Sequence, residues 1–100
     1  MTELRSRHDP LDSRRRRARF RAWRRGTREM DLILGAFADA RVGMLSDGDL
    51  DDFEALMEVS DTDLFGWIAG GSPVADPFDR PVLRAIIGFH KNTHLPGRGR

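Results

Sequence analysis

Hydrophobic residues recur along this chain with the three- and four-residue spacing of amphipathic helices, and no stretch alternates apolar and polar residues long enough to predict a strand. The clearest series lies within residues 27–38, and its apolar members share one helix face: Met30, Ile33, Leu34 and Phe37. Glu29 and Asp31 stand in the first turn, where the positive end of the helix dipole favours carboxylates. This segment therefore predicts an amphipathic helix that begins near Thr27.

An earlier, arginine-rich helix is predicted from its N-cap, Ser13, to about residue 24. Phe20 and Trp23, three residues apart, are expected to anchor one face of it. Gly26 ends the pattern, because glycine readily adopts the left-handed conformation that terminates helices.

Three further helices are predicted in the second half of the chain. Ser46, with Asp49 three residues later, resembles a capping box and begins the first of them. Asp61 is the N-cap candidate of a short helix that ends at residues 70–71, and the last helix begins near Asp79 after two X-Pro turns. Their predicted apolar faces contain Leu50, Phe53, Leu56, Met57, Leu64, Phe65, Trp67, Ile68, Val82, Leu83, Ile86 and Ile87.

Five short amphipathic helices predict an all-α fold, a compact bundle in a single domain over residues 13–92. Residues 1–12 are predicted to form a flexible N-terminal arm and residues 93–100 a flexible C-terminal tail. The large side chains predicted to be substantially buried are Trp23, Phe37, Phe53, Phe65, Trp67 and Ile86.

The composition excludes several classes of protein. The chain has 100 residues and no cysteine, which excludes a disulfide framework, a thiolate metal site and a thiol nucleophile. Its apolar runs are too short for a membrane span, and none follows the early arginines as in a secretory signal. No serine has a nucleophile-elbow context and no glycine-rich loop follows a strand. We therefore expect a soluble intracellular protein that is not an enzyme and does not insert into membranes.

The net charge of +1 conceals a strong segregation of charge along the chain. Residues 1–28 contain eleven arginines and three acids, a net charge of +8. Residues 29–65 contain eleven acids and one arginine, a net charge of −10, and residues 66–100 carry +3. Such a polarity is typical of a docking surface or of a self-complementary fold.

An acidic run has part of the spacing of a calcium-binding loop. Asp47, Asp49 and Asp51 match the first positions of an EF-hand loop and Glu58 matches the last, but Asp52 stands where the loop requires glycine. The apolar period of a helix also continues through the run. We interpret it as a helix N-terminus whose acids complement the helix dipole.

Two histidines have the spacing of zinc ligands on one helix face. His90 and His94 are four residues apart, but no Cys, Asp or Glu nearby completes a ligand set. We interpret them as histidines at a helix C-terminus and predict no metal site.

The arginines between residues 14 and 28 leave a nucleic-acid-binding function open. No helix-turn-helix spacing, RNP motif or series of stacking aromatics accompanies them, and the acidic segment that follows would repel a duplex. The alternative function is thus a small basic, helical nucleic-acid-binding module that uses the arginine-rich arm.

An R-G-x-x-E element stands between the first two predicted helices: Arg25-Gly26-Thr27-Arg28-Glu29, with Trp23 just before it. About 35 residues downstream follows the element Asp61-x-Asp63-Leu64-Phe65-x-Trp67. In these elements, and over about residues 13–92, the chain resembles the FAD assembly factors of succinate dehydrogenase, the SdhE family, known in mitochondria as succinate dehydrogenase assembly factor two. The family's fold is a small five-helix bundle, which agrees with the helical pattern.

The resemblance implies a chaperone-like assembly factor. Such a factor binds the flavoprotein subunit of succinate dehydrogenase, and of fumarate reductase in some bacteria, and promotes covalent attachment of FAD to it. The resemblance implies no cofactor bound stably by this chain, a monomer when free, and a location in the bacterial cytoplasm or, in a eukaryote, the mitochondrial matrix. Which flavoprotein is the partner, and whether the factor touches FAD, stay open.

The resemblance also implies the partner-binding residues, which are Arg25, Gly26, Arg28, Glu29 and Asp31. Their chemistry suits an interface, since Gly26 permits close backbone approach and Arg25 can donate two hydrogen bonds to a carboxylate or to carbonyls. Glu29 can pair with a partner arginine or cap its own helix. The alternative is that Arg25 and Glu29, four residues apart, only pair with each other, which is worth at most about 0.5 kcal/mol.

Overall fold

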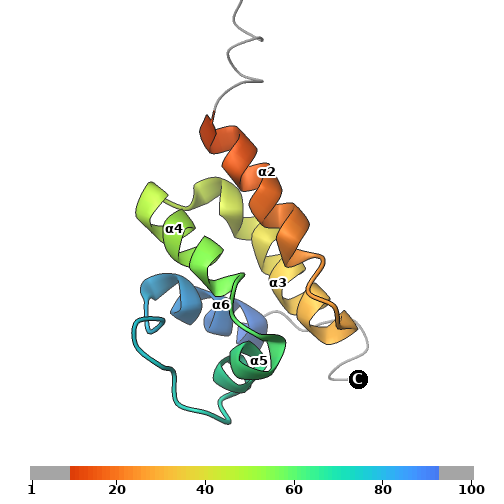
Figure 1. Cartoon of the computed structure of the whole chain (residues 1–100), viewed down its shortest axis with the longest axis vertical. Helices are drawn as coiled ribbons and strands as arrows, with labels where there is room; N and C mark the ends of the chain where they lie inside the picture. The colour runs from red at the N-terminus through yellow and green to blue at the C-terminus, as the bar shows by residue number, and fades with distance from the viewer. Residues whose placement is uncertain (1–9, 93–100) are drawn as a thin grey trace, which may run out of the picture.

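The computed structural model describes residues 10–92 (Figure 1). They form five α-helices and one short 3-10 helix, with no strand in this part of the chain: α2 (Pro10–Ala22), α3 (Arg28–Arg41), η1 (Val42–Met44), α4 (Asp47–Leu56), α5 (Asp61–Ala69) and α6 (Pro81–Asn92). The predicted all-α fold is therefore confirmed. Residues 10–12 of the predicted arm are helical, whereas the rest of the arm, the predicted tail and His94 lie outside the described residues.

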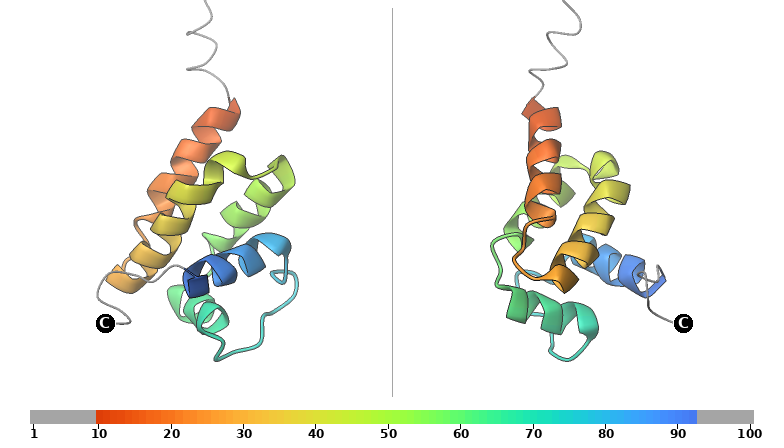
Figure 2. Two further views of the ribbon diagram at one scale, coloured as in Figure 1. Left: turned by 180° about the vertical axis from the view of Figure 1, so that it is seen from behind. Right: turned by 90° about the vertical axis from the view of Figure 1, so that its right-hand side faces the viewer.

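Helices α2 and α3 form an antiparallel pair along the long axis. Helix α4 lies beside the middle of this pair, and α5 and α6 lie toward its lower end (Figure 1, Figure 2). Helix η1 turns the chain from α3 toward α4. Helix α6 contacts α3, α4 and α5, so the last helix closes the bundle formed by the earlier ones.

The core is built by the apolar faces that the helical spacing predicts. Phe37 of α3 and Phe53 of α4 are fully buried and stack with their ring centroids 5.9 Å apart. Trp67 of α5 stacks on Phe78 at 5.5 Å, which joins α5 to the loop before α6. The predicted burial of Phe37, Phe53, Trp67 and Ile86 is confirmed.

Three aromatic side chains are more exposed than their sequence pattern predicts. Phe65 is 39% exposed, because it lies one residue outside the buried i, i+3, i+4 face of α5. Phe20 is 58% exposed and does not anchor α2, which instead buries its small residues Ala18 and Ala22. Trp23 is half-buried. The prediction of burial was wrong for Phe65 and holds only in part for Trp23.

The predicted N-terminus was wrong for two helices, α2 and α5. Helix α2 begins at Pro10 and not after Ser13, because the fixed φ of proline suits the first helical position. Ser60, not Asp61, is the N-cap of α5, and its hydroxyl accepts the Asp63 N–H at 3.2 Å.

The acidic run begins helix α4. Its N-cap is Ser46, whose hydroxyl accepts the Asp49 N–H at 3.1 Å, as predicted. Asp47, Asp49 and Asp51 lie within α4 and Glu58 lies in the turn after it, so three of the four carboxylates lie on a helix surface and not in a loop that wraps around an ion. Among residues 10–92, no helix is both long and apolar enough to cross a membrane.

Candidate functional site

The connection between α2 and α3 adopts a backbone conformation that its sequence requires. Gly26 has a φ of +114°, a left-handed value that other residues rarely adopt, and it is exposed with no heavy atom near its missing Cβ. Thr27 then caps α3, because its hydroxyl accepts the Met30 N–H at 3.3 Å. The chain thus reverses direction at Gly26 and presents the start of α3 to solvent.

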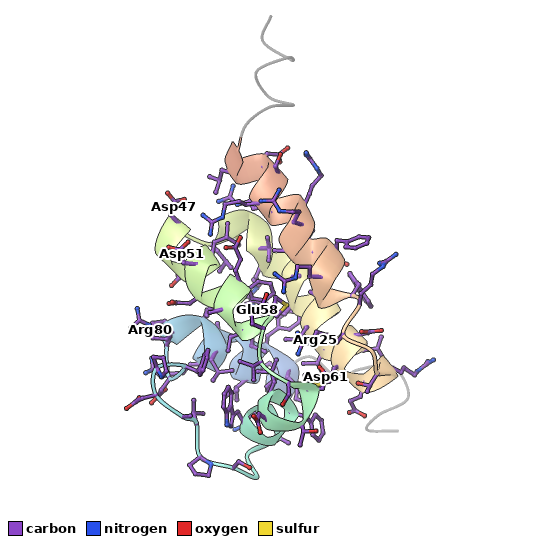
Figure 3. The ribbon with its side chains drawn as sticks, in the orientation of Figure 1. Arg25, Asp47, Asp51, Glu58, Asp61 and Arg80 are labelled. Atoms are coloured by element: carbon purple, nitrogen blue, oxygen red, sulfur yellow. The ribbon has the colours of Figure 1, made fainter. Side chains whose placement is uncertain are left out.

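Arg25 ties this connection to a distant part of the fold. Its Nε donates to Asp61 Oδ1 at 2.8 Å, and its Nη1 donates to the carbonyl of Met57 at 2.5 Å (Figure 3). Its Nη2 donates to the carbonyl of Val59, and only 9% of the side chain is exposed. The backbone N–H of the same residue donates to Asp31 Oδ1 at 2.6 Å. Arg25 therefore joins the α2–α3 connection to the α4–α5 connection.

The two remaining charged residues of the motif point outward. Arg28 and Glu29 are exposed and form no ion pair or hydrogen bond with another side chain in the described part of the protein. The pairing of Arg25 with Glu29 is not formed, because the guanidinium uses Asp61 and two carbonyls instead. Within the motif, an inward-facing arginine thus fixes the backbone and Arg28 and Glu29 are left accessible.

An open hollow of about 260 Å³ lies beside Glu29, between α3 and α5. Its lining residues are Thr27, Glu29, Met30, Asp61, Thr62 and Phe65. The exposed ring of Phe65 therefore belongs to the same surface as the motif carboxylate. Helical spacing by itself does not assign Phe65 to a functional site. The signal in the sequence is that Phe65 lies outside the buried face of α5, where core packing does not require an aromatic residue.

Two arginines of α2 form ion pairs with acidic residues of α4 and of the α4–α5 connection. Arg14 binds Glu54 through Nε and Nη2, at 3.0 and 2.9 Å, and binds Asp51 at 2.6 Å. These hydrogen bonds, to Glu54 first and then Asp51, raise the pKa of the Arg14 guanidinium above its ordinary value. Arg21 pairs with Glu58 in the same way. The segregated charges are therefore partly self-complementary, and these arginines are not free to bind phosphates.

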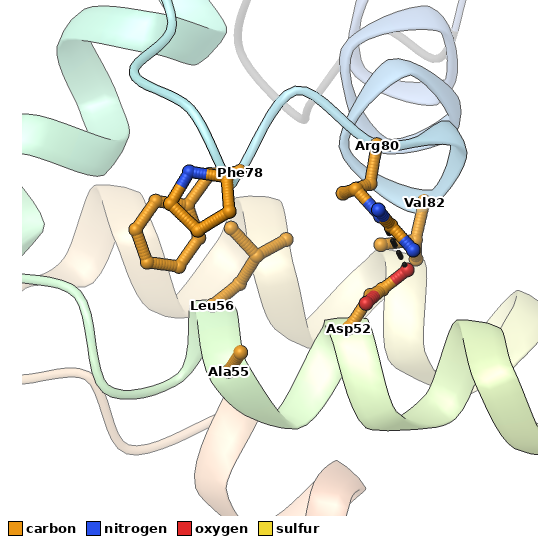
Figure 4. Close-up of a pocket in the computed structure, with 7 residues that line it drawn as sticks. Asp52, Ala55, Leu56, Phe78, Arg80 and Val82 are labelled. Atoms are coloured by element: carbon orange, nitrogen blue, oxygen red, sulfur yellow. Dashed lines mark hydrogen bonds and ion pairs between the residues drawn. The ribbon is translucent and has the colours of Figure 1, made fainter.

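A second cavity, of about 270 Å³, lies between α4 and the loop before α6 (Figure 4). Its two charged groups pair with each other, since Arg80 Nε lies 3.3 Å from Asp52 Oδ2. Leu56, Phe78 and Val82 line the rest, so the cavity presents no nucleophile or general base beyond an ion-paired carboxylate.

Comparison with known proteins points to one family. The family model described as "Flavinator of succinate dehydrogenase", Sdh5, matches residues 16–90. The "FAD assembly factor SdhE" of Acetobacter pasteurianus is 37% identical over 79 residues, which are 79% of this chain and 72% of that protein. The mitochondrial "Succinate dehydrogenase assembly factor 2" of Dictyostelium discoideum is 31% identical over 85 residues, which are 85% of this chain and 60% of that protein. The SdhE of Vibrio cholerae is 41% identical over 49 residues, which are 49% of this chain and 57% of that protein. In agreement with the sequence resemblance, this chain belongs to the Sdh5 family of succinate dehydrogenase flavinators, a family of assembly factors and not of enzymes.

Proposed function

We propose that this chain binds the flavoprotein subunit of succinate dehydrogenase and promotes the covalent attachment of FAD to that subunit. Family membership supports the activity, and one structural observation supports its location: the motif's inward-facing Arg25 fixes the loop while its Glu29 is exposed. The reactive groups belong to the flavoprotein and its FAD. This chain contributes the positioning of those groups and holds no cofactor of its own.

The five predicted partner-binding residues take two roles in this proposal. Gly26, Arg28 and Glu29 contact the flavoprotein, because they are exposed on one connection. Arg25 and Asp31 hold that connection in shape from within, through the contacts of the Arg25 side chain and backbone. Loss of either group of residues is expected to weaken docking, but only loss of the second removes side-chain contacts within the free protein.

Several finer features are part of the same proposal. The free chain is a monomer, and its partner is the flavoprotein of succinate dehydrogenase or, in some bacteria, of fumarate reductase. The named relatives are bacterial and mitochondrial, which fits a bacterial cytoplasm or a mitochondrial matrix as the place of action. The nucleic-acid-binding alternative is less favoured, because Arg14, Arg21 and Arg25 form ion pairs within the fold.

The proposal is tested by replacing Glu29 with alanine and measuring covalent flavin on the flavoprotein, in cells that lack the native factor. Glu29 has a matched control in Asp47, an exposed carboxylate in the first turn of α4 at the far end of the molecule (Figure 3). Either change should cost the free protein about 0.3–1 kcal/mol, the worth of a carboxylate near a helix N-terminus.

Only Glu29→Ala should weaken flavoprotein binding, by about 2–5 kcal/mol, because it leaves a partner cation unpaired. Loss of covalent flavin with Glu29→Ala, and its retention with Asp47→Ala, is the expected result. Normal flavin attachment with Glu29→Ala would show that Glu29 is not a contact. Flavin attachment that does not depend on the chain at all would refute the proposed function.

A further inference from the structure

Six of the arginines between residues 14 and 28 fall into two sets with different surroundings. Arg14, Arg21 and Arg25 form ion pairs with acidic residues of α4, of the α4–α5 connection and of α5, respectively. A second set points outward with two aromatic rings and forms what we call the Phe20 face: Arg17, Phe20, Trp23, Arg24 and Arg28. The fold neutralises the first set of charges and leaves the second set exposed.

The Phe20 face combines positive charge with exposed apolar surface. The Phe20 ring is 58% exposed, and the Arg24 guanidinium carbon lies 4.0 Å from its centroid in a cation–π contact. Arg17 and Arg28 have no ion pair among the described residues. The nearby carboxylates of Asp31 and Asp39 already accept hydrogen bonds, from the Arg25 backbone and from the Trp23 indole at 3.2 Å. These neutral donors leave both carboxylates charged, but among the described residues Arg17, Arg24 and Arg28 form no ion pair with them or with any other carboxylate.

The Phe20 face is continuous with the motif. One open hollow, of about 590 Å³, lies along α2 over Phe20, and a second, of about 580 Å³, lies over Gly26 and Arg28. Trp23 and Arg24 line both hollows. A partner seated on the Gly26 connection therefore reaches the Phe20 face without crossing another element.

We infer that the Phe20 face is a second part of the flavoprotein docking surface, and that it takes an acidic patch of the flavoprotein with an apolar centre. Carboxylates of that patch would pair with Arg17, Arg24 and Arg28, while its centre covers the Phe20 ring. The inference rests on the proposed function, because the motif identifies the partner. A polypeptide is favoured over a nucleic acid, since a phosphate backbone offers no apolar group that could cover the exposed Phe20 ring.

The test compares two variants of the Phe20 face with a control elsewhere. Phe20→Ala removes the exposed ring, and Arg17→Glu/Arg24→Glu reverses two unpaired charges. Arg84→Glu/Lys91→Glu makes the same change in net charge on exposed residues of α6. Each protein is titrated with purified flavoprotein subunit at low and at physiological salt.

Phe20→Ala is expected to weaken binding about tenfold, as a central aromatic contact does. The double reversal on the Phe20 face should weaken binding by about 10- to 100-fold at low salt and by less at physiological salt. The control should bind within about threefold of the unmodified protein, the range of a charge outside the interface. With 5-fluorotryptophan in the factor, the fluorine signal of half-buried Trp23 should shift on binding, and that of Trp67 in the core should not.

Three results would overturn the inference. If both Phe20-face variants bind normally while Glu29→Ala does not, docking is confined to the motif and the proposed function stands. If the unmodified chain does not bind the flavoprotein, the proposed function fails with it. If a short DNA or RNA duplex binds the unmodified chain, and the double reversal abolishes only that binding, the face is a nucleic-acid surface.

Discussion

Replacing Gly35 with alanine tests how α2 and α3 come together. Gly35 lies buried within α3, and a Cβ there would stand 2.2 Å from Cδ2 and 2.3 Å from Cε2 of the Trp23 indole. Carbon atoms in good contact lie about 3.5–4.0 Å apart, so the indole would have to move by roughly 1.5 Å. Such a movement would break its hydrogen bond to Asp39.

The expected loss of stability is the balance of three effects. Overpacking costs about 1–3 kcal/mol, and the lost hydrogen bond costs about 0.5–1.5 kcal/mol. Alanine in a helix interior recovers about 1 kcal/mol relative to glycine. Gly35→Ala should therefore destabilise the protein by about 1–3 kcal/mol, which lowers the Tm of a domain of this size by about 4–8 °C for each kcal/mol.

Thermal melting followed by circular dichroism measures this effect, and Gly88 provides the control. Gly88 lies within α6 with no heavy atom near its missing Cβ, so Gly88→Ala should raise the Tm through helix propensity alone. In a Trp23→Ala background the clash is absent, and Gly35→Ala should then also be neutral or stabilising. A Tm for Gly35→Ala equal to or above that of the unmodified protein would refute the packing argument.

Substitutions at three further positions test the core and the motif. Trp67→Ala should cost about 3–5 kcal/mol and unfold much of the domain in a denaturant titration, because Trp67 is buried against Phe78; unchanged melting would contradict this account of the core. Arg25→Lys should destabilise the free protein by about 3 kcal/mol, since a single ammonium group cannot replace the forked contacts to Asp61 and two carbonyls. A Tm within about 2 °C of the unmodified value would show that these contacts contribute little. Gly26→Ala and Gly26→Arg should both destabilise the protein by about 1–3 kcal/mol and lower its Tm, because each strains the backbone at positive φ. Only Gly26→Arg should abolish flavoprotein binding in a pull-down. Equal binding by the two variants would place Gly26 outside the interface.

The apolar period predicts helices well where large side chains form the buried face. The series beginning at Met30 has such a face, and α3 begins at Arg28, next to the predicted start near Thr27. Helix α2 differs, because it buries Ala18 and Ala22 and exposes Phe20. A prediction based on large apolar residues therefore assigns the wrong buried face to α2. The residues on its true buried face are small, which lets α3 approach closely.

The motif was located by resemblance, but the roles of its residues could not be read from the sequence. Arg25 and Asp61 are 36 residues apart, and nothing local links them. The neighbouring pair of Arg25 with Glu29 fits helical spacing better and does not form. Long-range ion pairs depend on the packing of several helices, so the division between buried and accessible motif residues required the structure.

The contact of Arg25 with the α4–α5 connection also couples partner recognition to the folding of the whole domain. The connection that carries Gly26 is held by carbonyls of Met57 and Val59, which take their places only when α4 and α5 have formed. A chain that ends before these residues would contain the complete R-G-x-x-E element without the support that shapes it. Binding and folding are therefore thermodynamically linked, so a saturating flavoprotein should raise the unfolding temperature of the entire bundle. Conversely, a destabilised core should weaken docking in proportion to the fraction of molecules that remain folded.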